Sequence, residues 1–200
     1  MEDAAEALGS LYKRRHAGTF GQFGVLSFNG NKIITGGGGG MILCSKEAAL
    51  RAKHLSTVAK VSHPYEYIHD DVGFNYRLPN INAALICGQL EKIESFIEKK
   101  RALAHTYAEY FLSKGMQPVC EPKDCRSNYW LKAVICEDFD QRSVLLEETH
   151  AAGVATRPVW TLISRMSTYR DCVTDELANS TWLESRVVCL PSSVPQGGTI

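Results

Sequence analysis

The sequence has no net charge, no long apolar run and no closely spaced cysteine pair. Its 22 basic residues balance 22 acidic residues, so the composition favours neither a nucleic acid nor an acidic membrane surface as partner. No apolar run approaches the roughly 20 residues that span a bilayer. We therefore expect a cytoplasmic protein with no membrane or nucleic-acid partner.

Metal-binding signals are equally scarce. The seven cysteines contain no CxxC pair and the six histidines show no metal-ligand spacing, so neither a zinc site nor a thioredoxin-type site is expected. We expect no metal, and we interpret the cysteines as reduced thiols, several of them buried as small apolar groups.

Short apolar runs alternate with glycine in the first part of the chain. GVLSF (24–28) and MILC (41–44) have the length of strands and are bounded by turn residues. The run KEAALRAKHLSTVAK then predicts a helix over 46–60. Strands followed by a helix predict an α/β arrangement.

A long helical pattern follows over residues 80–114. Apolar residues recur there mostly at helical intervals, with Pro79 before the start and Gly115 after the end. Such a helix would extend roughly 50 Å, enough to join two domains. We therefore expect the carboxyl-terminal part of a large domain over 1–79, a connecting helix over 80–114 and a small domain over 115–200.

The small domain alternates strand-like and helical runs. Strands are expected at YWLKAVIC (129–136) and VVCLPSS (187–193), and helices near 140–152 and 174–186. This order predicts an α+β lobe.

The first residues, EDAAEALGS, look like a loop and helix that follow a strand, yet no strand precedes them. A covered α/β sheet also needs more strands than the two that precede the long helix. We therefore expect the chain to start within a fold, as a truncated or split gene or a fragment would.

Lys32 lies between a strand-like run and five consecutive glycines, Gly36 to Gly40. The glycines are neither a P-loop, because no Gly-Lys-Ser/Thr follows, nor a dinucleotide fingerprint, because no helix opens from them. A lysine that forms a Schiff base with pyridoxal phosphate needs a carboxylate and hydroxyl donors nearby. Asp3, Glu6 and Ser27 could supply them. The pattern alone leaves Lys32 open between this role and that of a solvated turn residue.

Three long stretches carry a resemblance to a known family. They are EDAAEALGS, GTFGQFGVLSFNGNKIITGGGGGMI and HDDVGFNYRLPNINAALICGQLEKIESFIEKKR, followed by SNYWL, ATRPVW and LPSS. Together they resemble the DegT/DnrJ/EryC1/StrS family of sugar aminotransferases. The resemblance implies pyridoxal phosphate as cofactor and the aspartate-aminotransferase-like type I fold, here as a partial large domain plus a small α+β lobe.

The resemblance also implies roles for individual residues. Lys32 would bind pyridoxal phosphate covalently and then act as the general base. Asp3 would pair with the pyridinium nitrogen, and Glu6 would lie near the phenolic edge of the ring and the substrate. Ser27 would bind the phosphate, and Asn75 would reach the cofactor phosphate of the neighbouring subunit in a homodimer with shared active sites.

Three more residues are implied as substrate contacts. Arg77 follows Asn75 in the same motif, and a structural salt bridge is an equal alternative for it. Arg157 and Trp160 would lie where the small lobe approaches the substrate. The glycine run lacks the threonine or acidic residue expected there, which predicts a looser loop.

Within the family, the sequence is most similar to enzymes that aminate C4 of a UDP-4-keto-6-deoxy-N-acetylhexosamine, in bacillosamine or legionaminic-acid type pathways. Glutamate would be the amino donor, and the product would serve surface-polysaccharide or glycan synthesis. Some family members are dehydratases with histidine at the lysine position, so Lys32 favours amino transfer. The alternative is a non-catalytic remnant that keeps at most a dimerisation surface or weak cofactor binding.

Overall fold

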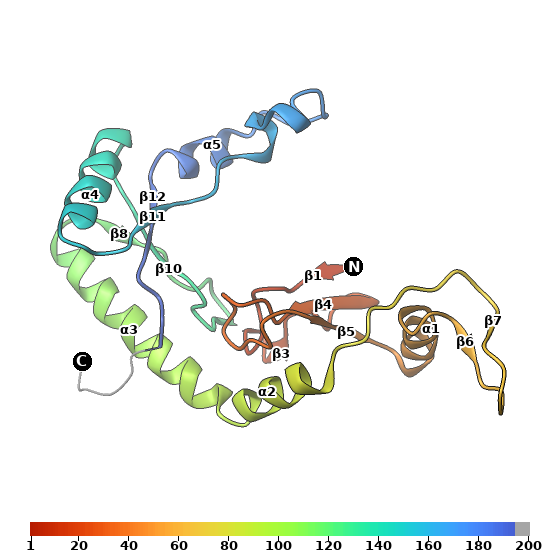
Figure 1. Ribbon diagram of the computed structural model, residues 1–200. Coiled ribbons are helices and arrows are strands. Elements are labelled where there is room, and N and C mark those ends of the chain that lie inside the picture. Colours follow the sequence, from red (N-terminus) through yellow and green to blue (C-terminus); the bar gives the residue numbers. More distant parts are fainter. Residues whose placement is uncertain (195–200) are drawn as a thin grey trace. The chain divides into compact units, whose positions relative to one another are not determined.

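The computed structural model describes residues 1–194 and separates into two compact units (Figure 1). Unit 1 comprises Met1–Ile97 and Lys123–Trp130, and unit 2 comprises Glu98–Pro122 and the chain from Leu131 onward. The division falls inside a helix, and unit 1 includes a segment from the expected small lobe. The assignment of 1–79 and 115–200 to a cofactor-binding domain and a small domain stays a prediction.

The main sheet of unit 1 has the order β1-β4-β5 (Figure 1). Its strands are β1 (Glu2–Asp3), β4 (Phe23–Ser27) and β5 (Gly40–Cys44). The strands expected at 24–28 and 41–44 are confirmed by β4 and β5. β1 runs parallel to β4 and β5 runs antiparallel to it. The expectation for EDAAEALGS was wrong, because Glu2–Asp3 form a strand and turns rather than a helix follow.

Two neighbouring features explain why β4 lies where it does. Gly24 and Leu26 are buried on one face of the strand. A Cβ atom on Gly24 would lie 1.8 Å from the carbonyl oxygen of Gly18, so only glycine permits this close approach. Beyond the strand, the side chains of Phe28, Ile34 and Ile86 form a buried cluster. Phe28 and Ile34 therefore anchor both ends of the loop that carries Lys32.

A second small sheet in unit 1 has the order β3-β2-β9. Its strands are β2 (Leu11–Tyr12), β3 (Arg15–His16) and β9 (Cys125–Arg126). β2 and β3 form a hairpin whose turn residues Lys13 and Arg14 have φ of 47° and 65°, as a primed two-residue turn requires. The pairing of β2 with β9 brings residues 123–130 into unit 1.

Helix α1 (Lys46–Ser56) and a small hairpin complete the region before residue 80. The side chain of Ser45 caps α1 by accepting a hydrogen bond from the backbone N–H of Ala48. The helix ends at Ser56, before the expected limit at residue 60. Strands β6 (Lys60–Val61) and β7 (Ile68–His69) pair in an antiparallel ribbon.

The expected single helix over 80–114 is wrong in one respect, because it is two helices. They are α2 (Asn80–Leu90) and α3 (Ile93–Ser113) (Figure 1). The backbone N–H of Lys92 bonds to the carbonyl of Gln89 at 3.0 Å, a tighter turn than the α-helix makes. α3 begins in unit 1 and ends in unit 2.

Unit 2 is built on an antiparallel sheet of order β11-β12-β10-β8. Its strands are β8 (Gln117–Pro118), β10 (Lys132–Ile135), β11 (Arg157–Pro158) and β12 (Val187–Leu190). Its shorter helices are α4 (Phe139–Ala151) and α5 (Ala178–Glu184). Its core contains Phe111, Val134, Cys136, Val188 and Leu190. The α+β pattern expected for this region is present, although β10 and α5 are shorter than expected.

Across the described residues, no helix combines the length and apolar character needed to cross a bilayer.

Candidate functional site

The carboxyl ends of β1 and β4 bring four of the predicted site residues to one edge of the sheet. Asp3 ends β1 and Ser27 ends β4, and Asp3 lies opposite Val25. Because side chains two residues apart share a face of a strand, Asp3 and Ser27 lie on the same face. Glu6 and Lys32 follow in the turns beyond these ends. Open α/β sheets bind ligands at this edge.

Lys32 is held by two side chains. Its Nζ lies 3.1 Å from Oε1 of Glu6 and 4.3 Å from the ring centroid of Trp130. The side chain of Lys32 is 12% exposed, whereas that of Glu6 is 53% exposed. The turn itself is closed by a 3.0 Å bond from the backbone N–H of Lys32 to the carbonyl of Asn29. A shielded amine thus faces a carboxylate that remains accessible to a ligand.

Asp3 and Ser27 each make one local hydrogen bond. Oδ1 of Asp3 accepts from the backbone N–H of Ala5 at 3.1 Å, and Oγ of Ser27 accepts from that of Asn29 at 3.3 Å. A carboxylate can accept several bonds and a hydroxyl can also donate one. Both groups therefore retain the capacity to bind a ligand.

Glu2 fixes the loop that precedes β4. Its carboxylate accepts hydrogen bonds from the backbone N–H groups of Gly18 and Gly21. These bonds, that from Gly21 first, lower the pKa of Glu2. Glu2 precedes Asp3 on β1, so its side chain points to the opposite face of the strand.

The glycine run is tied to helix α2. The backbone N–H of Phe28 donates to the carbonyl of Gly39 at 2.9 Å, and that of Gly36 donates to the carbonyl of Phe28 at 3.0 Å. The side-chain amide of Gln89 bonds both the N–H and the carbonyl of Thr35, at 3.1 and 2.6 Å. These bonds define one conformation of the loop, and the looseness expected from the missing threonine or acidic residue stays a prediction.

Asn128 and Trp130, in the stretch SNYWL, are two residues near Lys32 that the sequence pattern did not predict for the site. Asn128 and Trp130 are 3% and 8% exposed. The side-chain amide of Asn128 donates to the carbonyls of Glu6 and Leu8, at 2.8 and 2.9 Å. Nε1 of Trp130 donates to the carbonyl of Asn31 at 2.7 Å. The only sequence signal for these two residues was a polar amide close to a tryptophan, a large apolar residue that is usually buried.

Asn75 and Arg77 lie in a different part of unit 1. Asn75 forms an isolated backbone bridge with Thr57. Arg77 is exposed and lines a cavity of about 390 Å³. The other lining residues are Thr57, Lys60, Val61, Ser62 and His63. The side-chain contacts given above for Lys32 involve neither Asn75 nor Arg77, so their roles across a dimer stay predictions.

Arg157 and Trp160 belong to unit 2. Nη1 of Arg157 lies 2.9 Å from the carbonyl oxygen of Thr156 and 3.1 Å from Nε2 of His150. Trp160 is 67% exposed. Their expected contact with a substrate stays a prediction.

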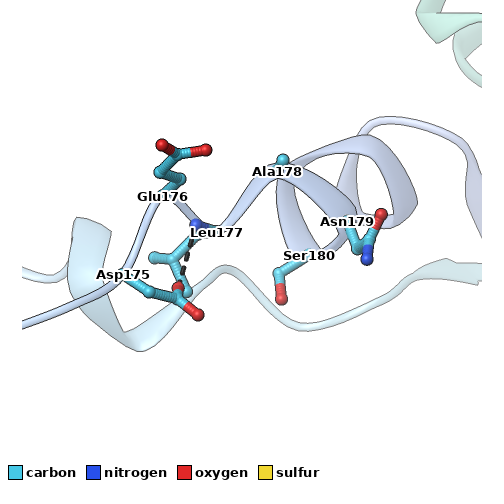
Figure 2. A pocket seen from close by; sticks show the side chains of 6 residues that line it. All are labelled: Asp175, Glu176, Leu177, Ala178, Asn179 and Ser180. Carbon is cyan, nitrogen blue, oxygen red and sulfur yellow. Dashed lines mark hydrogen bonds between the residues drawn. The ribbon is translucent and has the colours of Figure 1, made fainter.

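A cavity of about 470 Å³ lies at the start of α5 in unit 2 (Figure 2). Oδ1 of Asp175 accepts from the backbone N–H of Leu177 at 2.9 Å and shapes this turn. The lining residues, 175–180, include none of the predicted site residues. The volume of a cavity therefore does not by itself identify the functional site.

Within residues 1–194, no group of three or more histidine, cysteine, aspartate or glutamate side chains is arranged to hold a metal ion.

Comparisons with known proteins identify the family. The model of the "DegT/DnrJ/EryC1/StrS aminotransferase family" matches residues 1–196. EpsN of Bacillus subtilis (strain 168), named as a pyridoxal phosphate-dependent aminotransferase, is 37% identical over 162 residues, which are 80% of this chain and 42% of EpsN. The GDP-perosamine synthase of Escherichia coli O157:H7 is 36% identical over 172 residues, 86% of this chain and 47% of the synthase.

Among solved structures, the chain resembles Helicobacter pylori PseC, an aminotransferase involved in the biosynthesis of pseudoaminic acid. The TM-score is 0.89 at 24% identity, and the match covers 96% of this chain and 53% of PseC. The fold is therefore that of part of a type I pyridoxal-phosphate-dependent enzyme. The chain spans about half the length of the curated relatives and solved structures that it matches.

Proposed function

The chain belongs to the DegT/DnrJ/EryC1/StrS aminotransferase family, and on this premise we propose that it carries out the pyridoxal-phosphate-dependent transfer of an amino group to a sugar nucleotide. The observation that carries the proposal is the position of Lys32. Its amine lies at the carboxyl end of β4, beside Glu6 and on the edge that also carries Asp3 and Ser27.

The residues at this edge fit the cofactor. The amine of Lys32, whose side chain is 12% exposed, can bond covalently to an aldehyde carbon. A carboxylate at the end of the neighbouring parallel strand suits a protonated pyridine nitrogen, since charge-assisted hydrogen bonds are the strong ones. A serine hydroxyl on the same face suits a phosphate oxygen. Lys32, Asp3 and Ser27 would thus hold pyridoxal phosphate, which supplies an electron sink when bound.

The chain's own residues then have distinct tasks. Lys32 would attach the cofactor and, as a free amine, would take and return the proton at the carbon that gains or loses nitrogen. Asp3 would keep the ring nitrogen protonated. Glu6, whose side chain is 53% exposed, would contact the substrate beside Lys32. Ser27 orients the phosphate end.

We infer a 4-keto sugar nucleotide as acceptor, with glutamate as donor and surface-polysaccharide or glycan synthesis as the context. The sequence resemblance supports a UDP-linked sugar, whereas the perosamine synthases among the relatives are named for a GDP-linked one. Both nucleotides therefore belong in the assay. We further propose a cytoplasmic homodimer in which Asn75 completes the partner's site and Arg77, Arg157 and Trp160 contact the substrate.

The test is reductive trapping. The chain is incubated with pyridoxal phosphate, reduced with borohydride and digested, and the labelled lysine is identified by mass spectrometry. We expect the label on Lys32 and none at that position in Lys32→Ala. Lys132 is the control lysine, because it is buried and burial lowers its pKa to about 7. The control variant Lys132→Met should keep the label on Lys32.

Label found on Lys132 or elsewhere, with Lys32 unmodified in a folded chain, would contradict the proposal and favour a non-catalytic remnant. Turnover is then measured with glutamate and with UDP- and GDP-linked 4-keto-6-deoxy sugars. Lys32→Ala should abolish it, because the variant lacks both the attachment point and the base.

A further inference from the structure

Resting on the function proposed above, we propose that Trp130 and Asn128 are positioning residues for the Lys32–Glu6 pair. The indole face of Trp130 holds the amine of Lys32 whenever that amine is not bonded to the cofactor. Asn128 fixes the turn that carries Glu6.

Trp130 is anchored to the same turn that it faces. Its ring lies 4.3 Å from Nζ of Lys32, within the roughly 6 Å at which a cation is attracted to an aromatic face. Its Nε1 donates to the carbonyl of Asn31, the residue just before Lys32, at 2.7 Å. The indole ring is therefore hydrogen-bonded to the same turn that carries Lys32.

Asn128 connects that anchor to Glu6. Both hydrogens of its side-chain amide are used, on the carbonyls of Glu6 and Leu8. Its Oδ1 accepts from the backbone N–H of Trp130 at 2.8 Å. One buried side chain thus holds the backbone of the acidic partner and the backbone of the aromatic partner at once.

The segment that supplies these two residues is itself fixed to unit 1. β9 pairs with β2, and Arg126 forms an ion pair with Glu94. The backbone N–H of Asn128 also donates to Oγ of Ser10 at 3.0 Å. The segment 123–130 is therefore a strap across the site edge, although residues on both sides of it in the sequence belong to unit 2.

Such a strap matters because Lys32 has two tasks that need the same location. It must attach the cofactor, and it must remain within reach as a base after it is released. A small displacement of a catalytic group can cost about 100-fold in rate. With an indole on one side and a carboxylate on the other, the released amine has a defined resting place.

The first experiment uses the ligand-free chain. Lysines are acetylated with a limiting amount of acetic anhydride, and the extent of labelling at Lys32 is read by peptide mass spectrometry. Trp130→Leu should raise the labelling rate of Lys32 about fivefold, the factor that corresponds to loss of a partly shielded cation–π contact. Trp130→Phe keeps an aromatic face and should give a smaller increase.

Two controls isolate the contact. Lys60, which lies 4.6 Å from the ring centroid of Tyr67, is the internal reference and should label equally in all variants. Trp182→Leu removes a tryptophan from unit 2 and should leave Lys32 unchanged. Circular dichroism checks that each variant is folded, and Trp130→Phe keeps the test available if Trp130→Leu is not. The proposal would be overturned if Lys32 in folded Trp130→Leu were acetylated at the rate of the parent protein. It would also be overturned by equal increases in Trp130→Leu and Trp130→Phe, because both variants lack the indole N–H and the loss of its hydrogen bond would then explain the change.

The second experiment uses the cofactor-loaded protein. Trp130→Phe and Trp130→Leu should lower kcat progressively, about tenfold for Leu, with KM unchanged, because the base and not the substrate contact is displaced. A rise in KM at constant kcat would overturn the positioning role. These results can be distinguished from a failure of the proposed function. Failure of borohydride trapping at Lys32 would contradict the proposed reaction. The acetylation experiment tests the contact between Trp130 and Lys32 without any cofactor.

Discussion

The pair formed by Lys32 and Glu6 is expected to matter more for function than for folding. Its two side chains differ in exposure, at 12% and 53%, and ion pairs with one accessible partner contribute about 0–1 kcal/mol to folding. Replacing Glu6 should therefore leave the fold intact. Any loss of turnover in Glu6→Gln can then be assigned to the site.

Asp3 allows a sharper prediction at the residue scale. Asp3→Asn keeps the size and one acceptor oxygen but removes the charge that would hold a protonated ring nitrogen. Covalent capture of pyridoxal phosphate at Lys32 should persist, and turnover should fall about 100-fold or more, as for loss of other proton-controlling groups. Borohydride trapping and steady-state kinetics on the same preparation measure both effects.

The matched control for Asp3 is its neighbour Glu2. The carboxylate of Glu2 serves the Gly18–Gly21 loop from the other face of β1. Glu2→Gln should lower the free energy of unfolding and should leave turnover by the folded protein close to that of the parent. If Asp3→Asn turned over at the parent rate, the ring-nitrogen assignment would be wrong.

The residues that could be predicted at this site are those whose neighbours lie close in sequence or follow paired strands. Asp3, Glu6, Ser27 and Lys32 meet at one sheet edge as expected. Asn128 contacts Glu6 across 122 residues, and no local pattern reports such a contact. Only the presence of a polar amide beside a buried tryptophan hinted at it.

At the scale of the elements, substitutions in the glycine run can test why glycine is needed at particular positions. A Cβ atom on Gly40 would lie 2.8 Å from the backbone oxygen of Leu26, and Gly39 has φ of +95° with Leu78 Cδ1 at 2.5 Å from its Cβ position. Gly40→Ala and Gly39→Ala should each destabilise the chain by about 1–3 kcal/mol, because backbone contact or a left-handed conformation cannot relax cheaply.

Gly38 is the control within the same run. Its Cβ position has no atom within 4 Å and its φ is not in the left-handed region. Gly38→Ala should be neutral or stabilising by about 0.4–1 kcal/mol, since alanine restricts the unfolded chain. Urea denaturation measures all three variants. Equal losses at Gly38 and Gly40 would show that loop flexibility, and not close contact, explains the run.

The helices show the limit of pattern reading at the element scale. The apolar spacing continues through Glu91 and Lys92 without glycine or proline, so one helix was expected where there are two. The side-chain amide of Gln89 donates to the carbonyls of both Thr35 and Leu85. The turn follows immediately after this residue, which is fixed by contacts in the glycine loop, and such tertiary contacts are invisible to periodicity.

At the scale of the whole molecule, the compact units are not continuous in the sequence. Residues 123–130 were expected in the small lobe, and the structure places them in unit 1. A two-residue strand such as β9 carries too little pattern to predict its partner β2. The α/β and α+β classes of the two regions were predictable because they depend on longer elements, such as β4, α3 and α4.

Buried titratable groups of unit 2 should make stability depend on pH. In unit 2, burial lowers the pKa of Lys100 to about 8, and burial with the nearby Lys100 charge lowers that of Lys132 to about 7. In the unfolded chain both lysines have the usual value of 10.5. Between these limits the unfolded state binds more protons than the folded state, so stability rises with pH. From pH 7 to about 8.5 the gain should be about 1–2 kcal/mol.

Above about pH 9 the opposite effect should set in. Burial raises the pKa of the Cys136 and Cys189 thiols and of Tyr107. These groups stay protonated in the folded state after their unfolded counterparts have lost the proton, so stability falls as pH rises further. The expected profile therefore rises above neutral pH and falls again at more alkaline pH.

Urea denaturation from pH 6.5 to 10 tests this profile, and three variants assign its limbs. Lys132→Met should raise stability at pH 7 and flatten the rising limb, because the buried amine no longer has to lose a proton on folding. Lys114→Met, at an exposed lysine, should leave the curve unchanged. Cys189→Ala should weaken the falling limb. Below about pH 6 both lysines are charged in either state, so their contribution to the slope disappears there. A parent curve that is flat or falling between pH 7 and 8.5 would mean that Lys100 and Lys132 keep their charge by reaching solvent or an anionic partner. In that case burial of these two amines would not determine how stability depends on pH.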